Sequence, residues 1–272
     1  FWFKAGCVFE ESDKNGTAHF LEHMIFKGSN EIMPGEFDHK IESLGGISNA
    51  STGYDDAHYY VLIPEINFRE SLALLTNIVL SPSINIHEFE KEKNVVIDEI
   101  KQQNDQPDEK LYNYFLRRVW ENNNYGKTIL GTEKDVQALK IEDLVKFHKK
   151  FYKNNNNICI AIAGNLSKKT FEGYYENDFP YLNQGKTSEI KNNNELMTNP
   201  KTGREEINFK NIEFSRIFMA WSIPSLKNQK MNIGFEILAS ILCVGRNSRL
   251  VKVLKEERNL VESIYVDVNG GE

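Results

Sequence analysis

The motif His19-Phe20-Leu21-Glu22-His23 constrains this chain more than any other feature of its 272 residues. On an α-helix, residues four apart lie on one face, so both imidazoles can reach a single metal ion. Glu22 lies about 60° around the helix from His19, so its carboxylate can face a ligand of the metal without binding the metal itself. The order H-x-x-E-H inverts the commoner H-E-x-x-H and is typical of inverted zinc peptidases. We therefore expect a zinc-dependent peptidase in which Glu22 is the general base.

The alternative for this motif is a pair of surface histidines on a charged helix. The chain has only six histidines, so the pattern is informative by itself. The residues around the motif also predict a buried helix, because most of them are apolar: Phe20, Leu21, Met24, Ile25 and Phe26. Buried histidines need partners, which favours a metal ion for His19 and His23.

A catalytic zinc ion needs a third protein ligand and an open position for water. Glu99 is the best candidate, because it lies in the apolar stretch 95–100 of a predicted helix. A carboxylate is buried at tolerable cost only if it is paired or bound to a metal. From chemistry alone Asp98 and Glu92 compete with it. Glu92, two turns earlier on the same face, is a candidate to hold a ligand histidine in the correct tautomer.

A structural zinc site is the remaining reading of the motif. Such sites are usually closed, with four ligands that often include cysteine. Cys7, Cys159 and Cys243 are far apart and none is near the motif, and Glu22 would then have no task. The cysteines are expected to be free thiols, which favours a reducing compartment such as the cytoplasm. A periplasmic or organellar location stays open, because the chain begins at Phe1 rather than at a methionine.

Composition excludes some classes of function. A net charge of −6 argues against a nucleic-acid binder, and no apolar run approaches the roughly 20 residues that a membrane span needs. The hydrophobic pattern predicts a mixture of strands and helices. We expect strands at 1–9, 47–52, 58–63, 158–163 and within 206–223, and helices at 18–26, 36–44, 67–80, 86–103, 108–120, 141–151, 168–177, 232–243 and 248–257.

The segment 183–203 predicts a linker, because it is polar, rich in Asn, Lys and Thr, and without periodicity. It separates an expected zinc-bearing peptidase domain, 1–182, from a second α/β unit, 204–272. The second unit is short for a domain, and we expect it to be truncated.

The stretch GTAHFLEHMIFKGS at 16–29 resembles, almost letter by letter, the metal helix of the insulinase/pitrilysin family of zinc peptidases. That family includes the mitochondrial processing peptidase and its bacterial relatives. Its second helix supplies a Glu ligand 76 positions after the second histidine, which here is Glu99, and an auxiliary Glu seven positions earlier, which here is Glu92. Further matches lie at 44–52, 125–126, 129–132, 160–165 and 245–250.

The resemblance implies one Zn²⁺ per chain and an α+β fold of two similar units in each half of the enzyme, each unit an antiparallel-rich sheet packed with helices. This chain would hold one complete unit and part of the next. Asn49 and Ala50 would lie on an edge strand that pairs with the backbone of an extended peptide or an unfolded precursor segment. Without the resemblance, Asn49 is an ordinary polar residue at a strand end.

The resemblance also implies a partner, because two halves of the family enclose a peptide chamber. The partner would be the C-terminal half of the same chain or a second subunit. The facing half supplies an Arg and a Tyr seven residues apart, and Lys255 and Glu262 occupy those places here. The pair would have to come from elsewhere, and the fragment alone is a doubtful peptidase. The alternative is a non-catalytic zinc-binding subunit or scaffold of a processing complex.

Overall fold

The computed structural model describes residues 1–121, 123–165, 167–178, 200–209, 212 and 214–269. The chain divides into two compact units, 1–218 and 219–272. The expected linker 183–203 lies mostly outside the described residues, so its boundaries stay a prediction.

An antiparallel sheet of four strands belongs to the first unit, in the order β2-β3-β1-β4. Its strands are β1 (Trp2–Phe3), β2 (Ile47–Thr52), β3 (Ala57–Leu62) and β4 (Ile158–Cys159). β2 pairs with β3 over its whole length, from Ile47 opposite Leu62 to Thr52 opposite Ala57. β2 is an edge strand of this sheet, so one side of its backbone has no strand partner among the described residues.

Helices make up most of the first unit. The α-helices are α1 (Thr17–Ile25), α2 (Glu36–Ser43), α3 (Phe68–Leu80), α4 (Ile86–Asp105), α5 (Pro107–Val119), α6 (Glu133–Ala138), α7 (Ile141–Phe151) and α8 (Lys168–Asp178). Short 3₁₀ helices are η1 (Cys7–Phe9), η2 (Glu65–Asn67), η3 (Asn124–Gly126) and η4 (Asn155–Asn157). The predicted α+β class, with an antiparallel sheet packed with helices, is confirmed.

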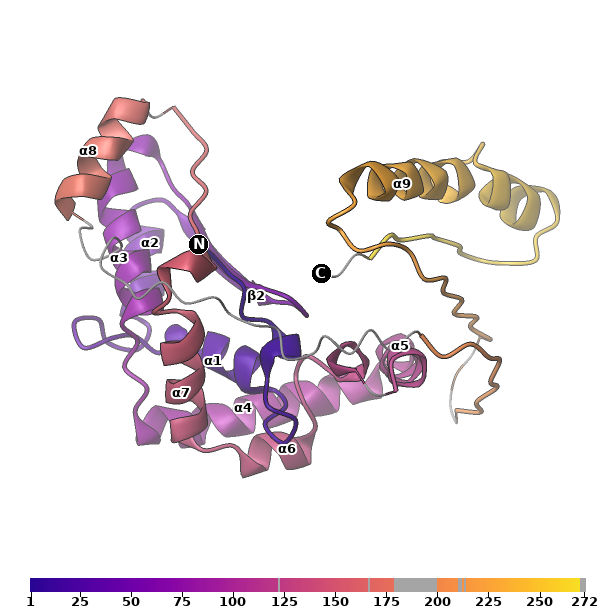
Figure 1. Cartoon of the computed structure of the whole chain (residues 1–272), viewed down its shortest axis with the longest axis horizontal. Coiled ribbons are helices and arrows are strands. Elements are labelled where there is room, and N and C mark those ends of the chain that lie inside the picture. The colour runs from indigo at the N-terminus through magenta and orange to yellow at the C-terminus, as the bar shows by residue number, and fades with distance from the viewer. Residues whose placement is uncertain (122, 166, 179–199, 210–211, 213, 270–272) are drawn as a thin grey trace. The chain divides into compact units, whose positions relative to one another are not determined.

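α1 lies between the sheet and α4, as Figure 1 shows. Its apolar side chains on several faces are buried, including the fully buried Phe20, Leu21 and Met24. Burying a side chain of this size stabilises the fold by about 1.5–3 kcal/mol. The helix is therefore held on several sides, and its polar side chains keep fixed positions.

The expected strand 1–9 is wrong beyond Phe3. The chain turns instead, because the amide groups of Cys7 and Val8 donate to the carbonyl groups of Gly53 and Tyr54 in the turn between β2 and β3. The expected strand 158–163 is likewise only two residues long.

The second unit contains α9 (Gln229–Cys243) and the π-helical segment η6 (Val251–Glu257). No strand occurs among the described residues of 206–223, so the expectation of strands there is wrong for those residues. A strand needs a neighbour to accept its hydrogen bonds, and no described residue pairs with this segment in a sheet.

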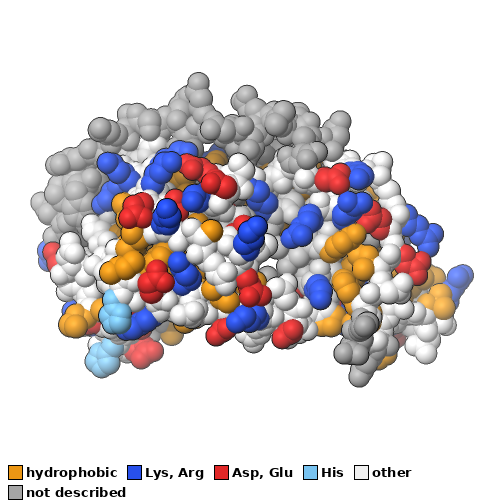
Figure 2. Space-filling model, turned by 90° about the horizontal axis from the view of Figure 1, so that it is seen from below, with side chains coloured by type: hydrophobic (Ala, Val, Ile, Leu, Met, Phe, Trp, Pro, Cys, Tyr) orange, Lys and Arg blue, Asp and Glu red, His pale blue; other side chains and the backbone are white. Residues whose placement is uncertain are grey.

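Acidic and basic side chains are intermixed on the molecular face shown in Figure 2. The described part of that face therefore offers no broad basic stripe of the kind that nucleic-acid binders present. Within the described residues, no helix has both the length and the apolar character that crossing a membrane demands.

Candidate metal centre

α1 presents both histidines of the motif toward the same space. The rings of His19 and His23 lie with their centroids 4.7 Å apart. The side chain of His19 is 10% exposed and that of His23 is 21% exposed. The helical spacing of four residues thus produces the shared face that the sequence predicts.

Glu99 reaches the two histidines from α4. Its Oε1 lies 3.7 Å from Nε2 of His19, and its Oε2 lies 3.4 Å from Nε2 of His23. One ligand atom from each of the three residues falls within 4.8 Å of the other two. Ligands about 2.1 Å from a tetrahedral ion lie about 3.4 Å from one another, so the observed spacings fit a zinc ion.

The three residues leave one side of the group open. The side chain of Glu99 is 41% exposed, in contrast to the buried His19. A catalytic zinc site needs such an open position, whereas a structural site is closed by a fourth protein ligand. Neither Asp98 nor Glu92 belongs to the group of atoms that could hold a metal among the described residues.

Glu92 lies behind His23 rather than beside the open space. Its Oε1 is 2.9 Å from Nδ1 of His23, and its Oε2 is 2.7 Å from Nζ of Lys27. An ionised carboxylate only accepts hydrogen bonds, so Nδ1 keeps its proton and Nε2 is the nitrogen that would lose its proton to bind a metal. Nδ1 of His19 is buried without a hydrogen-bond partner among the described residues, so its ring has no equivalent support.

The surroundings separate the pKa values of the two histidines. Burial, with a smaller contribution from His23, lowers the pKa of His19 to about 4. Burial also opposes the charged form of His23, but hydrogen bonds to Glu92 and Glu99 outweigh it and raise its pKa to about 9. The hydrogen bond from His23 lowers the pKa of Glu99, and burial only partly offsets this effect. The two carboxylates therefore stay ionised beside the imidazoles.

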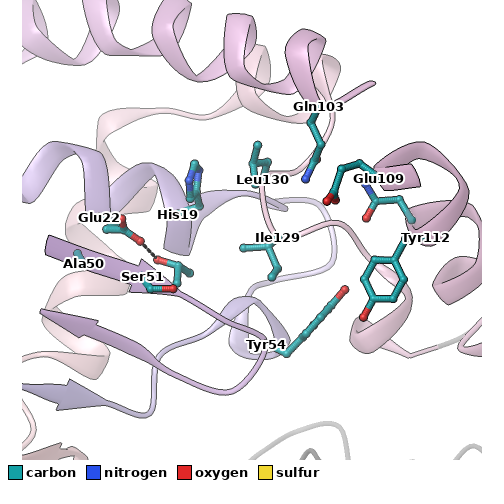
Figure 3. Close-up of a pocket in the computed structure, with 12 residues that line it drawn as sticks. His19, Glu22, Ala50, Ser51, Tyr54, Gln103, Glu109, Tyr112, Ile129 and Leu130 are labelled. Carbon is teal, nitrogen blue, oxygen red and sulfur yellow. Dashed lines mark hydrogen bonds between the residues drawn. The ribbon is translucent and has the colours of Figure 1, made fainter. Parts of the chain in front are cut away.

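Glu22 projects from α1 into a cleft with a volume of about 400 Å³. Figure 3 shows His19 and Glu22 on one side of this cleft, with Ala50 and Ser51 of β2 close by. The hydroxyl of Thr52 donates a hydrogen bond to Oε2 of Glu22. Burial raises the pKa of Glu22, while the bond from Thr52 acts in the opposite direction. The geometry places a carboxylate with a raised pKa beside the metal-binding group.

The predicted substrate-binding residues lie on β2. In the pairing of β2 with β3, Asn49 lies opposite Tyr60 and Ala50 lies opposite Tyr59. Ala50 lines the cleft, whereas Asn49 is exposed and its side chain accepts a hydrogen bond from the amide of Ala50. The structure thus places the edge strand beside the metal-binding group.

Sequence reasoning missed two residues that touch the predicted site. Thr52 donates a hydrogen bond to Glu22, and Lys27 forms a salt bridge with Glu92. Lys27 lies four residues after His23, so helical spacing could have placed it on the same face. Nothing in the sequence around Thr52 indicates its contact, because that contact depends on how β2 packs against α1.

Lys255 and Glu262 belong to the second unit. Lys255 lies in η6, and both residues are exposed.

An H-x-x-E-H helix with a distant glutamate facing both histidines has the layout of an inverted zinc-peptidase site. The model of the insulinase family (peptidase family M16) matches residues 1–133, and that of the peptidase M16 inactive domain matches residues 138–272. The chain therefore belongs to the insulinase family of peptidases, family M16.

Curated relatives agree with this membership. A protein of Rickettsia bellii named an uncharacterized zinc protease is 30% identical over 261 residues, which cover 96% of this chain and 62% of the relative. Zinc protease PqqE of Helicobacter pylori is 28% identical, with 99% of this chain and 63% of the relative covered. The beta subunit of the human mitochondrial-processing peptidase is 30% identical over 166 residues, 61% of this chain and 34% of the subunit. The chain thus spans less than two thirds of the length of these relatives.

Solved structures show the same fold. A protease from Helicobacter pylori superposes with a TM-score of 0.79 at 25% identity, covering 97% of this chain and 64% of the other. A peptidase M16 inactive domain from Pseudomonas fluorescens superposes with a TM-score of 0.76 over 99% of this chain and 64% of the other. Its 17% identity supports the fold alone.

Proposed function

We propose that the protein is a zinc-dependent endopeptidase that hydrolyses peptide bonds in extended peptides or unfolded precursor segments. The observation that carries this proposal is the convergence of His19, His23 and Glu99 beside Glu22 at an open cleft. Relatives named as zinc proteases support the same chemistry.

His19, His23 and Glu99 would hold one zinc ion. Zinc, when bound, supplies Lewis acidity that lowers the pKa of water and polarises a carbonyl group. Glu92 keeps His23 in the tautomer that leaves Nε2 available. The open side left by the exposed Glu99 is where water and substrate would enter.

Glu22 acts as the general base and then as the general acid. Its carboxylate takes a proton from the water that attacks the scissile carbonyl, and later gives a proton to the leaving amine. Burial raises the pKa of Glu22 above its ordinary value, which suits a group that must both accept and release a proton. The hydrogen bond from Thr52 fixes the orientation of the carboxylate.

The edge strand β2 would hold the substrate extended across the site. A peptide adds to a sheet edge through main-chain hydrogen bonds, so Asn49 and Ala50 would bind it largely independently of its sequence. Ala50 lines the cleft that contains His19 and Glu22, which supports a binding position for such a peptide next to the reacting groups. A second family half, from the rest of the protein or from a partner subunit, would complete the chamber.

The variant Glu22→Gln tests the proposal in the full-length protein. We expect it to bind zinc as the wild type does and to lose at least a hundredfold in peptide cleavage, because general base catalysis contributes roughly 10²–10⁴. Glu70→Gln, an exposed change of the same type on α3, is the matched control and should cleave normally. Near-normal cleavage by Glu22→Gln would overturn the assignment.

A non-catalytic zinc-binding subunit or scaffold is the second candidate. The match of 138–272 to a domain described as inactive favours it. Stoichiometric zinc with no cleavage by the full-length protein would support the scaffold. Cleavage that a chelator abolishes and zinc restores would support the enzyme.

A further inference from the structure

A buried carboxylate binds the N-terminus of α1, outside the site described above. Glu10 is 5% exposed. Its Oε2 accepts a hydrogen bond from the amide of Gly16 at 2.9 Å, and its Oε1 accepts one from the amide of Ala18 at 2.7 Å. The N-cap residue Gly16 has no side chain with which to cap the helix. Glu10 therefore supplies from a distance two of the acceptors that the amide groups at this helix end need.

A second set of contacts locks the same helix end against the segment 128–131. The side-chain amide of Asn15 donates to the carbonyl of Thr128 at 3.2 Å. Gly16 has a φ of +89°, and a Cβ there would lie 2.5 Å from the carbonyl oxygen of Leu130. Leu130 also lines the cleft, as Figure 3 shows. The start of α1 therefore has little freedom to shift relative to the cleft wall.

The predicted site residues follow directly from this anchored turn. His19 is the residue after Ala18, and Glu22 lies one turn further along α1. A metal centre needs its ligands held within about 0.5 Å of the productive geometry, and supporting groups commonly provide that precision. A displacement of the first turn would move His19 away from Glu99, which comes from another helix.

We propose that Glu10 is a positioning residue for the metal centre, which holds the first turn of α1 so that His19 faces Glu99 and Glu22 faces the cleft. The inference rests on the proposed zinc site but concerns a residue that touches neither metal nor substrate. Glu10 acts through the amides of Gly16 and Ala18.

The variant Glu10→Gln keeps the size of the side chain and removes one acceptor. The amide oxygen of glutamine can still accept a hydrogen bond from one backbone N–H group. Its NH2 group only donates, so the hydrogen bond to the other backbone N–H group is lost. Burial raises the pKa of Glu10 to about 8, although both backbone hydrogen bonds favour its ionised form. The comparison is therefore made above pH 8, where the wild-type residue is ionised.

The experiment measures zinc affinity by competition with a chelator, well below the unfolding temperature. We expect Glu10→Gln to bind zinc about tenfold more weakly than the wild type, as is typical when a supporting group behind a metal ligand is lost. Amide hydrogen exchange at Ala18 should become faster. Ile78→Val is the matched control, because it removes a fully buried methylene from α3 and lowers the melting temperature without changing α1.

Wild-type zinc affinity in Glu10→Gln would overturn the inference, as would an equal loss in Ile78→Val. If Glu10→Gln does not fold, Glu10→Asp replaces it, because the shorter carboxylate keeps its charge but reaches the amides less well. A smaller loss of zinc affinity, of about threefold, is then expected, and wild-type affinity again contradicts the inference. If the wild type itself bound no zinc, the proposed function would fail instead, so the two failures are distinguishable.

Discussion

The carboxylate of Glu92 should make zinc binding both tighter and more dependent on pH, and the variant Glu92→Gln separates these effects. Glu92 is buried, with Oε1 at 2.9 Å from Nδ1 of His23 and Oε2 at 2.7 Å from Nζ of Lys27. This carboxylate makes His23 a stronger ligand. Together with Glu99 it also raises the pKa of His23 to about 9, so below that pH zinc must displace a proton.

The two effects differ in their dependence on pH. Protons compete with zinc for His23 below pH 9 but not above it. The free-energy cost of removing this proton grows as the pH falls. For a pKa of about 9 it reaches about 2.7 kcal/mol at pH 7, which weakens zinc binding about a hundredfold. The hydrogen bond to the charged group contributes about 1.5–3 kcal/mol at any pH where Glu92 is ionised. Above pH 9 we therefore expect Glu92→Gln to bind zinc about 10–100-fold more weakly than the wild type. Between pH 9 and pH 7 the difference should narrow, because the variant has a less basic His23.

Zinc affinity, measured by competition with a chelator between pH 7 and pH 9.5, reports both proton competition at His23 and the hydrogen bond to Glu92. Glu90→Gln is the matched control, because it removes the same charge from an exposed position of α4 whose pairing with Lys93 is remote from the histidines. It should change zinc affinity less than twofold, as is usual for exposed ion pairs. Equal affinity of Glu92→Gln and the wild type above pH 9, or a difference that widens as the pH falls, would refute this reasoning.

Two further substitutions test the surroundings of the site. Thr52→Val removes the hydrogen bond to Glu22, so the pKa of Glu22 should rise further and the acid limb of the pH profile of kcat/KM should move to higher pH, while zinc affinity stays unchanged. Tyr152→Phe leaves the buried hydroxyl of Tyr59 without its partner at 2.9 Å, so the free energy of unfolding, measured with denaturant, should fall by about 1–3 kcal/mol without a change in zinc affinity. An unmoved acid limb, or an unchanged stability, would contradict the respective prediction.

Local spacing explains what the sequence could predict. His19 and His23 share a face because they are four residues apart on one helix, and this face is set within a single element. Local spacing was not enough to predict Glu99 as a ligand, because its distance from the histidines depends on how α4 packs on α1. Chemistry alone left Asp98 and Glu92 as competitors, and the resemblance to a known family selected Glu99.

Contacts between distant elements explain what the sequence could not predict. Thr52 meets Glu22 only because β2 packs against α1, and Glu10 reaches Ala18 only because the chain turns after Phe3. That turn also shortened the expected first strand, since local residue preferences carry no information about the distant carbonyl groups of Gly53 and Tyr54 that accept its hydrogen bonds. Side-chain type indicated the chemistry, whereas tertiary packing decided the supporting contacts.

The X-ray absorption spectrum at the zinc edge of the zinc-loaded protein tests the central claim most directly. The account predicts one zinc ion per chain with two imidazole nitrogens and carboxylate or water oxygens at about 2.0–2.2 Å. Scattering from sulfur at about 2.3 Å, or the absence of imidazole from the shell, would contradict binding by His19, His23 and Glu99.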